Sequence, residues 1–195
     1  LLERTGANTA LLITEGFRDI YEIGRVNRPD AYNLFFNKHQ PLVKRSLRFE
    51  VSERLRADGS THKPLDEAAV RDLARELKDQ NVEAVAVLLL HSYRNPAHEQ
   101  RVKQILQEEI PGAFVCASHE LSQEYREFER VSTAVANAYV GPRVSEYLGQ
   151  LETHLAGKGF DGDFYIVQST GGLFPVEHAK VGCVRMLESG PAAGV

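Results

Sequence analysis

The segment from Ala84 to Leu90 constrains the fold most strongly, because all of its residues are apolar. An apolar run without alternation is typical of a strand that is buried on both faces beneath helices. Amphipathic helical patterns lie on either side of it, and they begin near Asp66 and at Asn95–Pro96. We therefore expect an α/β fold in which helices cover a mostly parallel sheet.

Other segments carry weaker signals of the same class. Leu47–Ser52 alternates at period two, which predicts a strand with one buried and one exposed face, and Asp58–Gly59 predicts a hairpin. The stretch Leu121–Leu155 is helical in pattern, but Gly141–Pro142 interrupts it, so we expect two helices there. The remaining expected elements are strands at Ala10–Thr14, Phe114–Ala117, Phe164–Val167 and Val184–Leu187, and short helices at Phe17–Ile23 and Pro175–Lys180.

The composition is that of a folded chain with one packed core. The chain has 195 residues, 43% of them hydrophobic, and a formal net charge of -4. This balance, without a long block of like charges, argues against a dedicated nucleic-acid or membrane surface and favours small-molecule or protein partners. The longest apolar run is far below the roughly 18 residues of a membrane span. Cys116 and Cys183 lack metal-ligand or redox spacing, so we expect buried thiols and a cytoplasmic location.

The segment Gln168–Gly172 is the first candidate site, because it follows the predicted strand Phe164–Val167. Open α/β sheets bind ligands at the carboxyl ends of their strands, where glycines let a phosphate or carboxylate approach backbone amides. The alternative is that the glycine pair only makes a tight turn. The expected residues of a substrate or nucleotide cleft are Ser92, Gln168, Ser169, Gly171 and Gly172.

Two further patterns could serve function. His91 ends the buried apolar run, where it could transfer protons as a catalytic residue, although a lone histidine is often only a structural hydrogen-bond donor. Small residues near the carboxyl end of the chain could form an interlobe hinge near a nucleotide, or simply a tight helix start. The hinge residues are Ser189, Gly190, Pro191, Ala192, Ala193 and Gly194.

The other charged residues are expected to be structural. The run Glu124–Arg130 has helical spacing and predicts a solvated face. Arg18, Arg25 and Arg28 could meet an anion, but pairing with nearby carboxylates is the simpler interpretation. The histidines show no metal-ligand spacing, so no metal site is expected.

Short motifs follow one another along the chain, and together they are far more specific than any single glycine pair. They are Leu1–Gly6, Thr14–Asp19, Glu22–Arg25, Arg28–Pro29, Leu90–Tyr93, Asn95–Pro96, His98–Glu99, Asn137–Val140, Gln168–Ser169, Gly171–Gly172 and Ser189–Val195. In these motifs the chain resembles the hydantoinase A/5-oxoprolinase family over essentially its whole length.

The resemblance implies an ATP-dependent enzyme subunit that contributes part of a lobe of an actin-like ATPase fold. Such enzymes open hydantoins, 5-oxoproline or related cyclic amides by phosphorylating the ring carbonyl before water attacks, with ATP and Mg²⁺ as cofactors. A β-type subunit of an ATP-dependent acetone or acetophenone carboxylase is one alternative, and a non-catalytic assembly segment is another. The implied partners are a small cyclic amide and a second large subunit of the hydantoinase B type, with no nucleic acid or membrane.

The resemblance also implies an internal part of a longer protein. Family members carry two acidic Gly-Gly-Thr phosphate loops; neither occurs here, and they would precede Leu1 and follow Val195. Without those loops Mg²⁺ and the nucleotide phosphates lack ligands, so the chain alone is expected to be inactive and to hold no cofactor. We expect a single α/β unit of three regions: residues 1–118 (α/β), 119–156 (helices) and 157–195 (strand, helix and strand leading to the hinge).

Overall fold

A four-stranded parallel sheet organises the first part of the chain in this computed structural model, which describes residues 1–25, 30, 32–36 and 40–194. Every pair of neighbouring strands is parallel. This arrangement confirms the predicted α/β class with a mostly parallel sheet. From edge to edge the strands are β2 (Arg48–Val51), β1 (Thr9–Thr14), β5 (Ala84–Leu88) and β6 (Phe114–Ala117).

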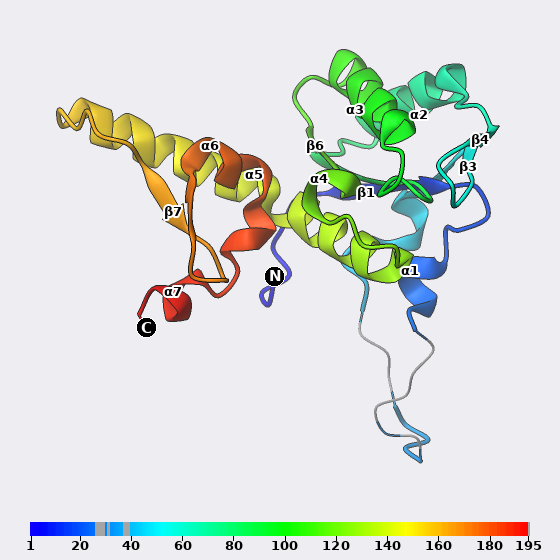
Figure 1. Ribbon diagram of the computed structural model, residues 1–195, viewed down its shortest axis with the longest axis horizontal. Helices are drawn as coiled ribbons and strands as arrows, with labels where there is room; N and C mark the ends of the chain where they lie inside the picture. The colour runs from blue at the N-terminus through cyan, green and yellow to red at the C-terminus, as the bar shows by residue number, and fades with distance from the viewer. Residues whose placement is uncertain (26–29, 31, 37–39, 195) are drawn as a thin grey trace.

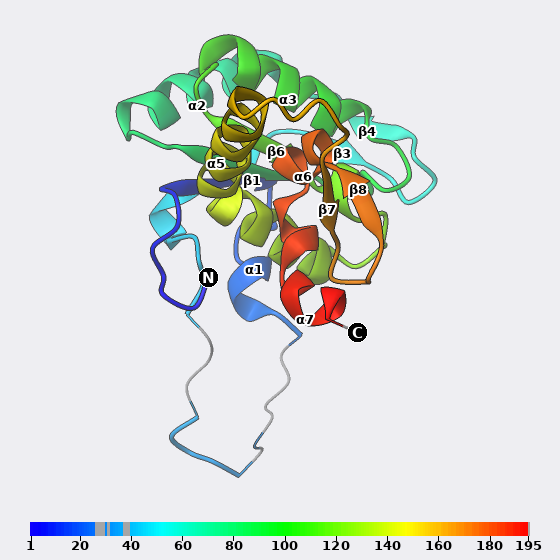
Figure 2. The same ribbon diagram turned by 90° about the vertical axis from the view of Figure 1, so that its left-hand side faces the viewer.

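Helices cover both faces of this sheet (Figure 1 and Figure 2). On one face lie α2 (Glu67–Asp79) and α3 (Ala97–Glu109), and on the other lies the first half of α5 (Glu127–Gly157). Alternate residues of β5 enter the two cores, which explains why this strand has no polar position. Val85 and Val87 face α2 and α3, whereas Ala84, Ala86 and Leu88 face α5.

Local signals set the starts of α2 and α3. A carboxylate oxygen of Asp66 accepts a hydrogen bond from the Ala69 backbone N–H at 3.0 Å, which caps α2. At α3 the side-chain oxygen of Asn95 accepts from the Ala97 N–H at 3.1 Å, and Pro96 already has helical dihedral angles. Both predicted helix starts are confirmed.

Small elements flank β2. They are α1 (Ile20–Ile23), the 3₁₀-helix η1 (Arg45–Leu47), and the antiparallel strands β3 (Arg54–Leu55) and β4 (Thr61–Lys63). The β3–β4 pair confirms the predicted hairpin, and α1 is shorter than the predicted helix Phe17–Ile23. Arg28 and Pro29 lie outside the described residues. In the described part of the chain, no helix combines the length and apolar character needed to cross a membrane.

β2 differs from its prediction at Arg48, which was expected on the exposed face but is only 3% exposed. Its guanidinium donates to a carboxylate oxygen of Glu22 at 2.8 Å and to the carbonyl oxygen of Val43 at 3.1 and 3.2 Å. It also lies over the ring of Tyr21. These partners replace water, so the cation is buried at the edge of the sheet.

α5 is one continuous helix of 31 residues, which corrects the prediction of two helices divided at Gly141–Pro142. A proline inside a helix removes one backbone hydrogen bond, but packing on both sides of Pro142 outweighs that loss. The first half packs against β5 and β6, and the second half packs against α6 (Val176–Val181) and η2 (Cys183–Met186). Figure 1 shows α5 passing from beneath the sheet to the second part of the molecule.

We expect Gly141→Ala to lower the free energy of unfolding by about 1–3 kcal/mol, because overpacking forces neighbours to move. A Cβ at this position would lie 2.4 Å from the ring of Phe114. Gly149→Ala in the same helix is the matched control, since nothing lies within 4 Å of its Cβ, and it should raise stability by about 1 kcal/mol. Urea unfolding measures both effects; equal gains from the two variants would contradict the close approach of α5 to β6.

The last part of the chain forms a hairpin of its own. β7 (Tyr165–Val167) pairs antiparallel with β8 (Leu173–Pro175), and neither strand joins the four-stranded sheet. The hairpin and α6 pack on the second half of α5 through a small separate core. Its buried members are Leu148, Phe174, Val176 and Ala179.

The predicted strand Val184–Leu187 is wrong, because residues Cys183–Met186 form η2, which is followed by the short helix α7 (Ser189–Ala193). Asn137 of α5 accounts for the difference. Its side-chain oxygen accepts from the Val184 N–H at 2.9 Å, and its side-chain nitrogen donates to the Val181 carbonyl oxygen at 2.9 Å. The Val184 N–H, which a partner strand would need, is therefore bonded to a helix side chain.

Candidate functional site

The chain turns sharply after β5, and His91 lies at this turn. Its backbone φ is +57°, in the left-handed region that residues other than glycine rarely adopt. The imidazole is half-buried, its Nδ1 lies 3.4 Å from the Tyr93 hydroxyl oxygen, and the two rings meet edge to face. The structure thus places His91 at the carboxyl end of the buried strand, where the sequence predicted it.

Glu99 of α3 is fully buried and ties three segments together at this edge of the sheet. Its carboxylate accepts hydrogen bonds from the Leu89 N–H at 2.8 Å, the Ser118 hydroxyl at 2.7 Å and the His119 N–H at 3.0 Å. The His119 Nδ1 lies a further 2.7 Å from it. Ser118 and His119 begin α4 (Ser118–Leu121), so one carboxylate joins the end of β5 to α3 and α4.

Arg130 of α5 completes the polar network from the opposite side. It donates from Nη2 to the Leu89 carbonyl oxygen at 2.7 Å and to the Ser92 hydroxyl at 2.9 Å, and its guanidinium lies over the Tyr93 ring. Nε and Nη1 are buried without a partner among the described residues. Burial lowers the pKa of this guanidinium. Arg130 therefore corrects the prediction of a solvated Glu124–Arg130 face, although Glu124 and Arg126 are exposed as expected.

A second buried carboxylate, that of Glu53, is hydrogen-bonded at the end of the neighbouring strand β1. The Thr14 hydroxyl at the end of β1 accepts from the Leu90 N–H at 2.9 Å and donates to Glu53. The other carboxylate oxygen of Glu53 lies 2.7 Å from His98 Nδ1. Protein groups thus fill this edge of the sheet, and the imidazole of His91 is half-buried there, like those of His98 and His119.

Sequence reasoning singled out Ser92 and His91 but missed Glu53, Glu99 and Arg130. Ser92 is only 1% exposed, and its hydroxyl lies 3.3 Å from that of Ser118. In this arrangement Ser92 braces the turn, and its contact with a ligand stays a prediction. One feature of the sequence could have pointed to Glu99. The pair His98–Glu99 lies in the first turn of a helix that follows the end of a buried strand.

Arg25 and the two cysteines have structural surroundings. Arg25 forms an ion pair with Glu129, which confirms the simpler interpretation of that arginine. Cys116 and Cys183 are buried free thiols, as predicted, and burial raises their pKa values to about 12 and about 11. Within the described ranges, no three His, Cys, Asp or Glu side chains gather in a way that could hold a metal ion.

The segment Gln168–Gly172 is the turn of the β7–β8 hairpin, which corrects the expectation of a loop between a strand and a helix of the main sheet. The Gln168 N–H donates to the Gly172 carbonyl oxygen at 2.7 Å, and Gly171 has a φ of +85°. The N–H groups of Gln168, Ser169 and Gly171 already donate within the protein. In this arrangement the turn is therefore not an open cradle for phosphate.

Ser169 joins this turn to the predicted hinge. Its N–H and its hydroxyl both donate to the Arg185 carbonyl oxygen, at 2.8 and 2.9 Å, and the hydroxyl also bonds to the Leu187 carbonyl oxygen. Leu187 lies two residues before α7, and α7 packs against β7. The structure thus places the Gln168–Gly172 turn close to the Ser189–Gly194 segment.

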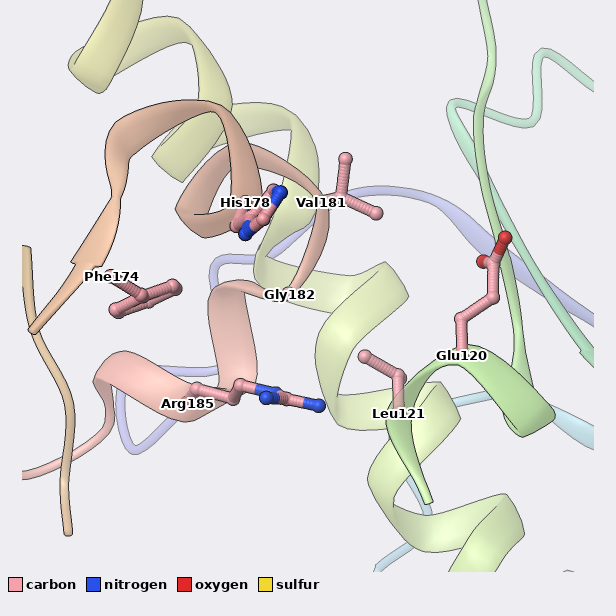
Figure 3. Close-up of a pocket in the computed structure, with 7 residues that line it drawn as sticks. All are labelled: Glu120, Leu121, Phe174, His178, Val181, Gly182 and Arg185. Carbon is pink, nitrogen blue, oxygen red and sulfur yellow. The ribbon is translucent and has the colours of Figure 1, made fainter. Parts of the chain in front are cut away.

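A cavity of about 320 Å³ lies between α4 and the α6–η2 segment. Figure 3 shows its lining residues, which come from both parts of the molecule. Because α4 also carries Ser118, which touches Ser92, this single turn of helix connects the His91 edge of the sheet with the cavity. The lining residues are Glu120, Leu121, Phe174, His178, Val181, Gly182 and Arg185.

Two family models match the chain in succession. The hydantoinase/oxoprolinase N-terminal region matches residues 1–110, and the hydantoinase/oxoprolinase model matches residues 130–195. The chain belongs to the hydantoinase/oxoprolinase family. The mostly parallel sheet of this hydantoinase/oxoprolinase chain is consistent with a lobe of an actin-like ATPase.

Relatives in this family include enzymes with different substrates. The chain is 36% identical to the caprolactamase α subunit of Pseudomonas jessenii over 99% of its length, and 30% identical to the 5-oxoprolinase of Saccharomyces cerevisiae over its whole length. It spans 28% and 17% of those proteins.

Two solved structures of this family match the fold closely. The ATP-dependent caprolactamase of Pseudomonas jessenii has a TM-score of 0.88 and 35% identity over 98% of the chain. A nucleotide-free acetone carboxylase has a TM-score of 0.87 and 29% identity over 99% of the chain. The match covers 28% and 29% of those chains, so this hydantoinase/oxoprolinase chain corresponds to less than a third of either one.

Proposed function

We propose that this chain is part of a subunit of an ATP-dependent cyclic-amide hydrolase of the N-methylhydantoinase or 5-oxoprolinase type. The observation that carries the proposal is the likeness to the ATP-dependent caprolactamase, at 35% identity over 98% of the chain. Since the chain spans only 28% of that protein, we propose that it works as an internal part of a longer subunit. A cytoplasmic location is proposed with it, and the two free buried thiols support this.

The proposed chemistry explains why ATP is needed to hydrolyse a cyclic amide. Resonance makes an amide carbon a poor electrophile, and small lactam rings reclose readily. In the proposed reaction the γ-phosphoryl group of ATP passes to the ring carbonyl oxygen and ADP leaves. Water then adds to the activated carbon, the ring C–N bond breaks to give an amine and an acyl phosphate, and a second water releases inorganic phosphate and the carboxylate. The described residues alone do not fit MgATP, because they contain no acidic metal cluster and the amides of the Gln168–Gly172 turn are largely engaged.

We assign His91 the proton transfer of the proposed reaction. The ring nitrogen must gain a proton as the C–N bond breaks, and attacking water must lose one. An imidazole is suited to either step near neutral pH. His91 is half-buried at the carboxyl end of β5, and the residues just before it, Leu89 and Leu90, are held by Glu99, Arg130 and Thr14, so the backbone that carries the ring is fixed.

A β-type subunit of an acetone or acetophenone carboxylase is the second candidate. The likeness to the acetone carboxylase, with a TM-score of 0.87, favours it. In either case we propose a large partner subunit of the hydantoinase B type, since several relatives are named as subunits. An assembly role without catalysis is the third candidate, for which the long helix α5 would offer a contact surface.

ATP turnover by a longer enzyme that contains this chain tests the proposal. We expect 5-oxoproline, hydantoin or caprolactam to stimulate phosphate release, whereas acetone or acetophenone with bicarbonate should not. Stimulation by a ketone instead would establish the carboxylase alternative, and no stimulation with tight partner binding would favour assembly. The 195-residue chain alone is the control: titration with MgATP should show no binding tighter than millimolar, and ATP hydrolysis by this chain would contradict us.

A further inference from the structure

The cavity between α4 and the α6–η2 segment has mixed walls. Leu121 of α4 and Val181 of α6 supply apolar surface, and the buried ring of Phe174 forms another side. Figure 3 shows the side chains of His178 and Arg185 on the remaining sides. A cavity with an apolar lining and a few polar groups is the usual form of a small-molecule site.

The charges in this cavity do not cancel. The only carboxylate among its lining residues is Glu120, which Lys103 holds at 2.7 and 2.8 Å, so its charge is already matched. In Figure 3 the guanidinium of Arg185 extends toward Leu121, across the opening between the two parts of the molecule. Among the described residues, neither this guanidinium nor the His178 imidazole has a hydrogen-bond or ion-pair partner. The cavity is therefore electropositive.

The backbone that carries Arg185 is held in place. Its carbonyl oxygen accepts hydrogen bonds from the N–H and the hydroxyl of Ser169, and its own N–H donates to the Gly182 carbonyl oxygen at 3.0 Å. The exposed side chain of Arg185 therefore projects from a fixed backbone. The same bonds attach this wall to the turn of the β7–β8 hairpin.

We propose that this cavity binds a small molecule with one carboxylate and a compact apolar body. The carboxylate would pair with Arg185, whose planar guanidinium matches its geometry, and the body would lie against Leu121, Phe174 and Val181. The cavity's size and its apolar walls favour such a molecule over a nucleotide. The proposed reaction does not use this cavity, so the inference goes beyond the proposed function.

Binding of three small probes to the chain tests this inference. L-5-oxoproline and cyclopentanecarboxylate share a carboxylate on a five-membered ring, and 2-pyrrolidinone is the same lactam as 5-oxoproline without the acid. In NMR titrations we expect both acids to bind and 2-pyrrolidinone to bind at least about tenfold more weakly. Arg185→Gln should weaken binding of both acids by about tenfold or more, whereas Arg143→Gln should leave it unchanged. Arg143 is an exposed arginine of α5 outside the cavity, which makes it a matched control.

Several outcomes would overturn the inference. Equal affinity for 5-oxoproline and 2-pyrrolidinone would show that the carboxylate is not recognised. Unchanged affinity in Arg185→Gln would place binding elsewhere, and inorganic phosphate binding as tightly as the acids would show that the apolar walls are unused. These titrations contain no ATP. A failure to detect ATP turnover would therefore not affect the binding result, and a failure to detect binding would not affect the turnover result.

Discussion

His91→Gln is expected to lower the turnover of a longer enzyme containing this chain by about a hundredfold or more, because it removes a general acid–base catalyst. Glutamine keeps much of the size and hydrogen-bonding capacity of histidine but cannot exchange a proton near neutral pH. The turn that carries His91 is held by Leu89 and Leu90, whose backbone groups bond to Glu99, Arg130 and Thr14. Since these bonds do not involve the imidazole, the fold should survive the change.

Steady-state kinetics at saturating ATP measure this effect. The loss should fall on kcat rather than on KM. His154→Gln is the matched control, because His154 is an exposed histidine near the end of α5, remote in sequence from the polar network. An unchanged kcat in His91→Gln would end its assignment as a proton carrier and leave it as a structural residue.

Glu99→Ala should lower the free energy of unfolding by about 3–5 kcal/mol, because removal of the buried carboxyl group leaves several hydrogen-bond donors unpaired. Those donors are the Leu89 N–H, the Ser118 hydroxyl and the His119 N–H. Glu99 and Leu89 are fully buried, and Ser118 is only 1% exposed. Such a loss is a large part of the stability of a typical domain.

Glu108→Ala on the same helix α3 is the matched control for Glu99→Ala. Glu108 also forms an ion pair, with Arg71 at 2.9 Å, but its side chain is 52% exposed. Exposed pairs contribute about 0–1 kcal/mol, so this variant should be almost as stable as the parent chain. Denaturant unfolding compares the two variants. Equal losses of stability in the two variants would contradict the claim that the buried carboxylate of Glu99 stabilises the fold more than an exposed one.

The elements that sequence reasoning located correctly are those with local signals. The strand at Ala84–Leu88 follows from an unbroken apolar run, and the starts of α2 and α3 follow from Asp66 and Asn95–Pro96, which satisfy backbone N–H groups within three residues. These interactions join residues that are close together in the sequence, so a single sequence is enough to predict them.

The errors and omissions share a different cause, which is contact between distant segments. Pro142 stays inside a helix because both halves of α5 are packed, and Val184 is not in a strand because Asn137 takes its N–H. The polar network was missed for the same reason: Arg130 bonds to Leu89, which lies 41 residues earlier in the chain. Charge and spacing alone gave no sign that this arginine is buried.

α5 links the sheet mechanically to the β7–β8 hairpin. At 1.5 Å per residue its 31 residues form a rod about 46 Å long. Arg130 clamps the near end to the turn after β5, while the far end carries the hairpin and α6. Because the first half of α5 is packed on β5 and β6, the direction of this one helix sets where the hairpin and α6 lie relative to the sheet.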